Sequence, residues 1–461
     1  MFFQQFKVEG LGCYSYLIGC PKAGVACVVD PERHVDRYID TARENGMRIT
    51  HIFDTHIHAD HITGSRELAR RTGAKIHVHH NAGAAYDHIP LRDGDRFKFG
   101  VANLEIIETP GHTPNSVTIA VSDTSRSKDP MLLLTGDLLF VGDIGRPDLA
   151  GEDLLEEQVK NLYDSLYAKL ARFPDGVEVY PAHGAGSLCG KGISPKPMTT
   201  LGFERRYNPL LNKMPFEKFR EIMTAEFQLR PPNFMAIVDK NRKGPGLLES
   251  DPPVRRLSVD EVETRRDGGA VIVDVRDATS FGAAFIPGSL NIGLKPQSPN
   301  WLGMVVDAKN DLVLVADSRE DALKAVRMFR RVGYDRITGF LDGGVAEWAA
   351  AGKPLKHLPQ LTAQSLSHVL EKYHDHVLID VRTEHEWASG HIKRAIHKPV
   401  GDLVKEGIDI DDKKRHITAI CGSGYRSNIA GSFLKSQGYE HVFSVIGGMT
   451  AWKNAQRLKV K

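Results

Sequence analysis

The sequence has few cysteines, no long apolar segment and almost no net charge. Its five cysteines among 461 residues are an odd number and lie scattered, which excludes a disulfide scaffold and favours a reducing compartment. One of the longest apolar stretches, Met131–Val141, is interrupted by Gly136 and Asp137 and is too short to cross a membrane. The net charge of +2 gives no reason to expect nucleic acid or a membrane as partner. Because residues 1–5 form neither a basic leader nor a sustained apolar segment, we expect a cytoplasmic protein.

Length and composition predict a globular chain of several domains. At 461 residues the chain is too long for one hydrophobic core and fits about three domains. Hydrophobic residues at 41% and charged residues at 26% are ordinary globular values. We predict a first domain over residues 1–195, where short strands alternate with amphipathic helices. Residues 196–252, rich in proline and charge, are predicted to be a linker that packs on this domain and partly covers its site.

A dense group of metal-binding residue types follows the predicted strand Ile49–Phe53. His56, His58, Asp60 and His61 lie within six residues. The alternating histidines cannot share one face of a helix, where neighbours are three or four residues apart, so an extended or turning loop must aim them. Imidazoles with one carboxylate suit zinc, iron or manganese better than calcium or magnesium. The alternative is a polar loop whose histidines only form hydrogen bonds.

Three further residues of metal-binding type occur downstream, each at the end of an apolar, strand-like run. They are His112, Asp137 and His183. The ends of several strands can meet at one edge of a sheet sandwich, so we expect these side chains to join the first group. Such a convergence favours a metal site over a polar loop.

This ordered set of residues resembles the metallo-β-lactamase superfamily, with the seven-ligand pattern of its glyoxalase II branch. The resemblance covers about the first 190 residues and implies an αββα sandwich that holds metal at its open edge. The residues that carry the resemblance are His56, His58, Asp60, His61, His112, Asp137 and His183.

Two residues near these motifs have an open role. Arg146 lies in a loop rich in Gly, Pro and Asp, where it either binds substrate or forms a structural pair with Asp148. Cys189 follows His183 in a glycine-rich stretch. We interpret Cys189 as a loop cysteine, because no neighbouring base or helix start indicates an activated thiolate.

An internal repeat organises the rest of the chain. The tripeptide Asp274–Arg276 recurs as Asp380–Arg382, and a Gly-Gly pair precedes Trp348 in the first copy and Trp452 in the second. Each copy alternates strands and helices, which predicts a small α/β domain with a parallel sheet. We place the two domains at residues 253–356 and 357–461.

The second copy contains a candidate nucleophile. The predicted strand His416–Ile420 runs into Cys421, and a helix is predicted to begin near Asn428. Backbone amides of the intervening loop and the helix start would stabilise a thiolate at Cys421, and Arg426 would hold the anionic end of a substrate. The alternative is a buried, inert cysteine. The predicted substrate-binding residues of the loop are Gly422, Ser423, Gly424, Tyr425 and Arg426.

These features resemble the rhodanese family of sulfurtransferases. The resemblance implies that Cys421 carries a persulfide between a donor and an acceptor. Four residues separate Cys421 from Arg426, whereas related phosphatases have five, so the shorter loop suits sulfur rather than phosphate. The first copy has Asp317 at the equivalent position, and because an aspartate cannot hold a persulfide, we expect that copy to serve packing or docking.

The whole chain resembles bacterial fusions of persulfide dioxygenase with sulfurtransferase, and the loop containing Arg146 also resembles that of persulfide dioxygenases. The resemblance implies iron(II) held by His56, His112 and Asp137, with three open positions for a persulfide sulfur and dioxygen. The remaining residues of the pattern would then form hydrogen bonds or transfer protons. Those residues are His58, Asp60, His61 and His183.

Two alternatives stay open at this stage. A glyoxalase II-like thioester hydrolase would use two zinc ions bridged by Asp137, and a sulfur-relay protein would keep only a vestigial metal site. The expected partners are a low-molecular-weight thiol persulfide, dioxygen, and sulfite or thiosulfate. The linker and the inactive repeat are surfaces through which a homo-oligomer could form.

Overall fold

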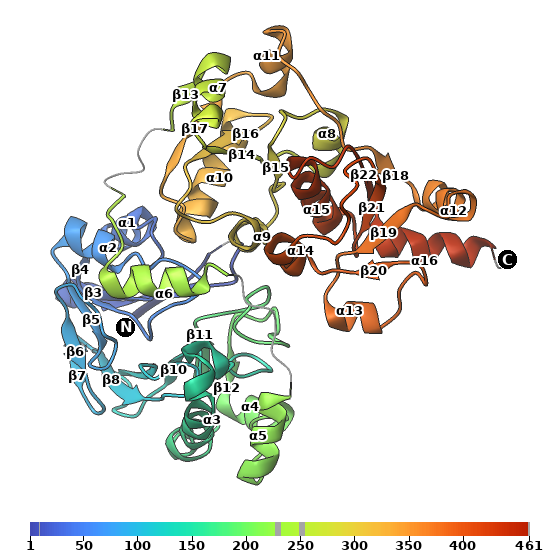
Figure 1. Cartoon of the computed structure of the whole chain (residues 1–461). Coiled ribbons are helices and arrows are strands. Elements are labelled where there is room, and N and C mark those ends of the chain that lie inside the picture. Colours follow the sequence, from blue (N-terminus) through green and yellow to red (C-terminus); the bar gives the residue numbers. More distant parts are fainter. Residues whose placement is uncertain (9, 226–231, 249–253, 460–461) are drawn as a thin grey trace. The chain divides into compact units, whose positions relative to one another are not determined.

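The structure is a computed structural model that describes residues 1–8, 10–225, 232–248 and 254–459. The chain divides into two units (Figure 1). The first contains Met1–Pro252 with Arg330–Gly333, and the second contains Pro253–Phe329 with Tyr334–Lys461. The boundary predicted between residues 252 and 253 lies outside the described residues.

The first unit contains two six-stranded sheets. One has the order β1-β2-β3-β4-β5-β6, and β3 to β6 run parallel. Its strands are β1 (Phe2–Lys7), β2 (Tyr14–Cys20), β3 (Val25–Val29), β4 (Arg48–Phe53), β5 (Lys75–His79) and β6 (Ile89–Leu91). The other has the order β12-β11-β10-β9-β8-β7, with β10 and β11 parallel. Its strands are β7 (Arg96–Phe99), β8 (Ala102–Glu108), β9 (Val117–Asp123), β10 (Leu132–Gly136), β11 (Glu178–Pro181) and β12 (Thr199–Thr200).

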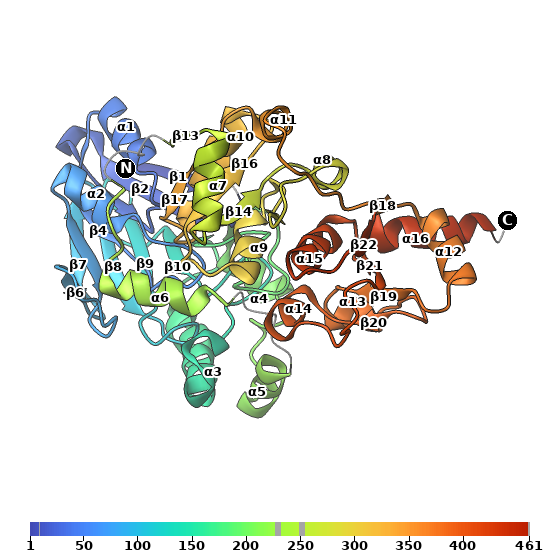
Figure 2. The ribbon, with the colours of Figure 1, turned by 45° about the horizontal axis from the view of Figure 1, so that its top comes forward.

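The two sheets face each other across an apolar core, and helices cover their outer faces (Figures 1 and 2). Alternating residues such as Ile18 and Phe53 from one sheet meet Leu104 and Ile119 from the other. On the outer faces, α1 (Asp36–Glu44) and α2 (Ser65–Thr72) pack on the first sheet, and α3 (Leu155–Asp164) packs on the second. The predicted αββα sandwich is confirmed.

Among its described residues, the segment after residue 195 adds three helices to this unit. They are α4 (Leu201–Tyr207), α5 (Phe216–Thr224) and α6 (Phe234–Lys243). Leu201 of α4 and Phe219 of α5 join the core beneath α3, while Phe234 of α6 packs with Ala59 and Leu149. Helix α6 therefore lies against the loop that follows β4. Short 3-10 and π turns are η1 (Pro21–Ala23), η2 (Asp148–Ala150), η3 (Glu152–Leu154), η4 (Ser165–Lys169) and η5 (Leu170–Arg172).

The second unit contains two five-stranded parallel sheets with the same strand order. The first repeat has the order β13-β17-β16-β14-β15, with strands β13 (Arg256–Leu257), β14 (Val271–Asp274), β15 (Leu290–Asn291), β16 (Leu312–Val315) and β17 (Ile337–Leu341). The second has the order β18-β22-β21-β19-β20, with strands β18 (Gln360–Leu361), β19 (Val377–Asp380), β20 (Ile396–His397), β21 (His416–Ile420) and β22 (His441–Val445). Two α/β repeats with parallel sheets were predicted, and both are confirmed.

In the described part of this unit, five helices accompany each sheet. In the first repeat they are α7 (Val259–Asp267), α8 (Ala278–Ala283), α9 (Ser298–Val305), α10 (Arg319–Arg331) and α11 (Gly344–Ala350). In the second they are α12 (Ala363–Lys372), α13 (Glu384–Ala388), α14 (Val400–Glu406), α15 (Tyr425–Ser436) and α16 (Gly448–Lys459). Among the described residues, no helix combines the length and apolar character that a membrane span requires.

The repeated Asp-Val-Arg tripeptide has a structural role. In the first repeat the buried Asp274 carboxylate accepts hydrogen bonds from Arg276, with the Nη2–Oδ2 distance at 2.6 Å. In the second, Asp380 and Arg382 form the same pair at 2.7 Å. Each arginine also donates to a backbone carbonyl just beyond the next helix, Ala284 after α8 and Gly390 after α13, so the pair fixes the chain where it leaves β14 and β19.

Replacing Trp348 with alanine should lower the free energy of unfolding by about 3–5 kcal/mol, because this side chain is fully buried and its Nε1 donates to Pro354. Trp452→Ala is the matched control, since Trp452 is only partly buried in the second repeat. Denaturant unfolding followed by far-UV circular dichroism measures both. An equal loss of stability in the two variants would contradict the assigned difference in packing.

Candidate functional site

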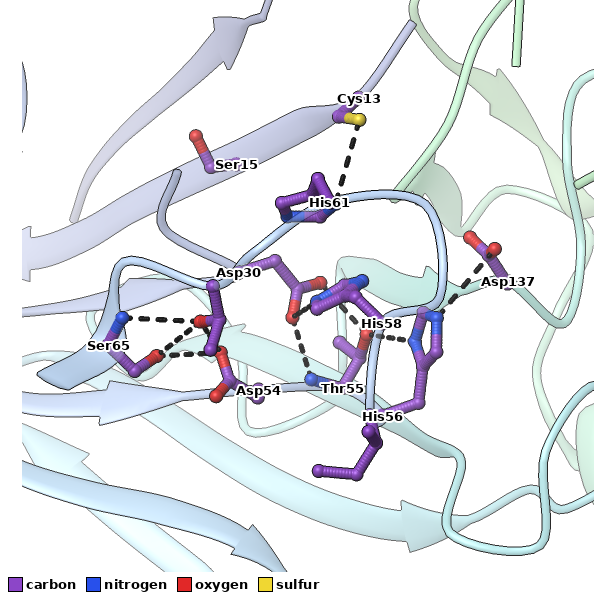
Figure 3. A network of polar contacts seen from close by, with 12 residues as sticks. Cys13, Ser15, Asp30, Asp54, Thr55, His56, His58, His61, Ser65 and Asp137 are labelled. Carbon is purple, nitrogen blue, oxygen red and sulfur yellow. Dashed lines mark hydrogen bonds and ion pairs between the residues drawn. The ribbon is translucent and has the colours of Figure 1, made fainter. Parts of the chain in front are cut away.

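Three side chains converge at the carboxyl edge of the first unit's sandwich. His56 follows β4, His112 follows β8 and Asp137 follows β10, and one potential ligand atom from each lies within 4.8 Å of the others. The Oδ2 atom of Asp137 is 3.2 Å from His112 Nε2 and 3.8 Å from His56 Nε2. Figure 3 shows the contact between Asp137 and His56. All three residues are buried. Asp137 Oδ2 has no hydrogen-bond partner among the described residues, and an ion bound at about 2 Å from each donor would satisfy it.

Hydrogen bonds fix the tautomers of the two histidines. His112 Nδ1 lies 2.8 Å from the carbonyl oxygen of Arg146, which can only accept, so Nδ1 carries the hydrogen. The Thr55 hydroxyl donates to Asp30 and therefore accepts from His56 Nδ1 at 3.0 Å. Both rings thus present an unprotonated Nε2 to the centre. Burial lowers the pKa of both histidines, which keeps them in the neutral form that a metal requires.

His58 does not join this group. Its Nε2 lies 3.2 Å from Asp30 Oδ1, and the ring belongs to a separate buried group with Asp30 and Asp54 (Figure 3). Burial raises the pKa of Asp54 to about 6, although Ser65 and Thr63 donate hydrogen bonds to it. The neighbouring histidines of the sequence motif therefore face different partners.

The other three residues of the seven-ligand pattern form a hydrogen-bonded chain. Asp60 pairs with His61 Nδ1 at 3.1 Å and with His183 Nε2 at 2.8 Å, and His183 Nδ1 pairs with Asp137 Oδ1 at 2.6 Å. Although burial opposes it, the charges of Asp137 and Asp60 raise the pKa of His183 well above its usual value. His183 therefore carries a proton on each ring nitrogen and bridges two carboxylates. Cys13 Sγ lies 3.2 Å from Asp60 and extends this group.

Several residues that position the site had no signal in the sequence. Asp30 is the one non-glycine residue with a positive φ, 49°, in the described part of the chain, and it accepts from the backbone N–H of Thr55 at 2.7 Å. Asn241 of α6 donates to the carbonyls of His58 and His61, at 2.9 and 2.8 Å. Asn241 lies about 180 residues later in the sequence, in a charged helix, and no local pattern there would reveal this role.

Arg146 forms a structural pair in this structure. Its Nε and Nη2 atoms donate to the two carboxylate oxygens of Asp148 at 2.6 and 2.7 Å, and its carbonyl orients His112. Arg146 and Leu188 also line a cavity of about 100 Å³. Cys189 is buried, with its sulfur within 4.8 Å of ligand atoms of Asp137 and His183. Burial raises the pKa of the Cys189 thiol to about 12.

In the second unit, Cys421 follows β21 and α15 begins at Tyr425, three residues before the predicted start. The backbone N–H of Gly424 donates to Cys421 Sγ at 3.1 Å, so the loop does aim an amide at the sulfur. The repeated Gly-Gly pair supports the loop, because a Cβ on Gly448 would lie 2.2 Å from the carbonyl oxygen of Cys421.

The side chains of the loop have partners that the sequence did not predict. Arg426 forms a bidentate pair with Glu386 of α13, with both distances 2.6 Å, so an anionic substrate must compete with that carboxylate. Burial would raise the pKa of Glu386, but Arg426 lowers it to about 2. The Tyr425 hydroxyl donates to the carbonyl of Gly293 in the first repeat at 2.9 Å. Gly422 is half-buried under the Arg426–Glu386 pair, and Ser423 is exposed.

Comparisons with known proteins agree with this architecture. The family model described as "Metallo-beta-lactamase superfamily" matches residues 8–184, and the "Rhodanese-like domain" model matches 258–351 and 362–455. A crystal structure of a metallo-beta-lactamase from Staphylococcus aureus subsp. aureus COL is 30% identical, with a TM-score of 0.68, over 74% of this chain and 98% of that one.

Two curated relatives match the first unit. A hydroxyacylglutathione hydrolase from a Polaromonas species is 36% identical over 37% of this chain, and the match spans 61% of that hydrolase. The mitochondrial persulfide dioxygenase ETHE1 of Homo sapiens is 32% identical over 47% of this chain and 78% of its own length.

His56→Ala should lower metal affinity at least about tenfold, because it removes one of three converging donors. His58→Ala should retain the metal, since His58 faces Asp30 instead. Metal content of the purified variants, measured by plasma mass spectrometry, checks both. Equal metal loss in the two variants would show that His58 is also a ligand.

Proposed function

Because the chain belongs to the metallo-beta-lactamase superfamily and continues into two rhodanese-like domains, we propose that it is an iron(II)-dependent persulfide dioxygenase joined to a sulfurtransferase. The observation that carries the proposal is the separate group of His56, His112 and Asp137, from which His58 is turned away. Two histidines and one carboxylate on a single ion are typical of non-haem iron oxygenases. The similarity to a human persulfide dioxygenase supports the same substrate class.

Iron(II) held by these donors would supply electrons and open coordination positions for a reaction between dioxygen and a thiol persulfide. The overall reaction takes a persulfide, dioxygen and water to the free thiol and sulfite. The chain's own residues keep the donors in place. His183 donates a proton from Nδ1 toward Asp137 Oδ1, which leaves Oδ2 for the metal, and Arg146 holds the ring of His112 through its carbonyl.

Cys421 would exchange sulfane sulfur with the product of the first unit. A persulfide on Cys421 transfers its outer sulfur to sulfite, giving thiosulfate and the Cys421 thiolate, and the same step runs in reverse when thiosulfate is the donor. The Gly424 amide stabilises the sulfur anion that leaves. In the first repeat the strand register places Ala316 where Cys421 stands, because Val315 pairs with Asp274 as Ile420 pairs with Asp380. The predicted equivalence of Asp317 is therefore one residue off, and neither Ala316 nor Asp317 can form a persulfide.

A thioester hydrolase with two zinc ions is the second candidate. The group of Cys13, Asp60, His61 and His183 offers donors for a second ion, and the hydroxyacylglutathione hydrolase of Polaromonas is a relative. In this structure, however, Asp60, His61 and His183 satisfy one another by hydrogen bonds.

The purified protein should contain one iron per chain and consume dioxygen when glutathione persulfide is added, because the three-donor site accommodates one ion. Metal analysis together with an oxygen electrode checks this. His56→Ala, which removes a donor, should abolish oxygen uptake. The proposal would be wrong, and the hydrolase correct, if the protein contained two zinc ions per chain, took up no oxygen and hydrolysed a glutathione thioester.

Cys421→Ser should leave oxygen uptake intact but change the product from thiosulfate to sulfite, because sulfur exchange requires the thiolate. Product analysis by ion chromatography measures the ratio. Cys20→Ser, at the end of β2, is the control for replacing a buried cysteine elsewhere. If the Cys421 variant still formed thiosulfate at the wild-type rate, Cys421 would not be the residue that transfers sulfur.

A further inference from the structure

A cavity of about 560 Å³ lies between the two repeats of the second unit. Its volume falls within the roughly 300–1,000 Å³ of small-molecule sites. The first repeat lines it with Lys295, Asp317 and Asp321, and the second lines it with Gly424 and Tyr425 of the Cys421 loop. The cavity therefore lies between the loop after β16 of the first repeat and the Cys421 loop of the second.

The first repeat, which has no cysteine in this loop, lines the cavity with charged side chains. Asp317 lies one residue beyond Ala316, the position equivalent to Cys421, and its side chain is exposed. Asp321 caps the start of α10 together with Ser318, whose hydroxyl donates to it at 2.7 Å. Within the described part of the chain, neither the Asp317 carboxylate nor the Lys295 ammonium has a hydrogen-bond or ion-pair partner. The cavity thus offers an anion and a cation that are both available to a ligand.

One wall of the cavity is the loop that follows the buried Cys421. Gly424 lines the cavity, and its backbone N–H donates to Cys421 Sγ at 3.1 Å. The Tyr425 hydroxyl bonds to Gly293 at 2.9 Å and lies 3.2 Å from Ser298 Oγ, which ties this wall to the first repeat. A ligand in the cavity would lie against the loop that carries Cys421.

We propose that this cavity binds the thiol that accepts sulfur from Cys421, and that the thiol is of amino-acid type, with both an ammonium and a carboxylate group. Asp317 and Asp321 pair with the ammonium group, and Lys295 pairs with the carboxylate. The proposal rests on the sulfurtransferase part of the proposed function.

The transfer itself needs no oxidant. The thiolate sulfur of the ligand forms a bond to the outer sulfur of the Cys421 persulfide, the S–S bond to Cys421 breaks, and Cys421 leaves as a thiolate stabilised by the Gly424 amide. The ligand departs as its own persulfide, which is the substrate class of the first unit.

The test compares two acceptors of sulfur from thiosulfate. With glutathione as acceptor, Asp317→Asn and Lys295→Gln should each raise KM about tenfold with little change in kcat, because each removes one charged contact. With cyanide, which carries no amino-acid groups, KM and kcat should stay at the wild-type values. Glu320→Gln and Lys309→Gln are matched controls, because both side chains are exposed and neither lines the cavity.

Binding is measured separately by calorimetric titration of glutathione into the full-length Cys421→Ser protein, where no transfer occurs. Binding that weakens in the Asp317→Asn and Lys295→Gln backgrounds supports the proposal. Absence of binding, or a KM increase that is equal for glutathione and cyanide, overturns it. Inactivity of the wild-type protein toward cyanide would instead refute sulfur transfer at Cys421, so the two failures are distinguishable.

Discussion

The first unit depends on burying one carboxylate among histidines. Asp137 has no exposed side-chain surface, and its two oxygens have different partners. One accepts from the protonated His183, and the other faces the neutral His112 and His56. Burying an isolated carboxylate would cost several kcal/mol or more, so the fold must supply positive charge on both sides. The protein supplies it through His183 on one side, and a metal ion at the proposed site would supply it on the other.

The convergence of His56, His112 and Asp137 was predictable because strand geometry fixes where these residues lie. Each residue follows an apolar run, and the ends of neighbouring strands in a packed sandwich meet at one edge. The direction of His58 was not predictable, because its partner Asp30 comes from the end of β3 and adopts a left-handed backbone conformation that local sequence does not reveal. The role of Asn241 depends on a helix that returns to the site from much later in the chain.

In the repeats, too, local sequence motifs were predictable, whereas pairs between residues far apart in the sequence were not. The recurring Asp-Val-Arg and Gly-Gly motifs indicated two copies of one fold, and both motifs are explained by contacts within a few residues or at a strand end. Arg426 was expected to face an anion, yet it pairs with Glu386, forty residues earlier in the sequence. Which carboxylate an arginine pairs with depends on the elements that pack beside it, so residue type alone could not identify Glu386 as the partner.

Loss of the nucleophile in the first repeat does not make that repeat dispensable to the second. Asn291 donates its backbone N–H to Ser432 Oγ at 3.0 Å and its side chain meets Asn428 at 2.6 Å, and all three residues are buried. Removing the first repeat would remove both hydrogen bonds, each worth about 0.5–1.5 kcal/mol, and would expose this face of α15 to water. Helix α15 begins in the Cys421 loop, so the reactive sulfur is held partly by a domain that cannot itself carry sulfur.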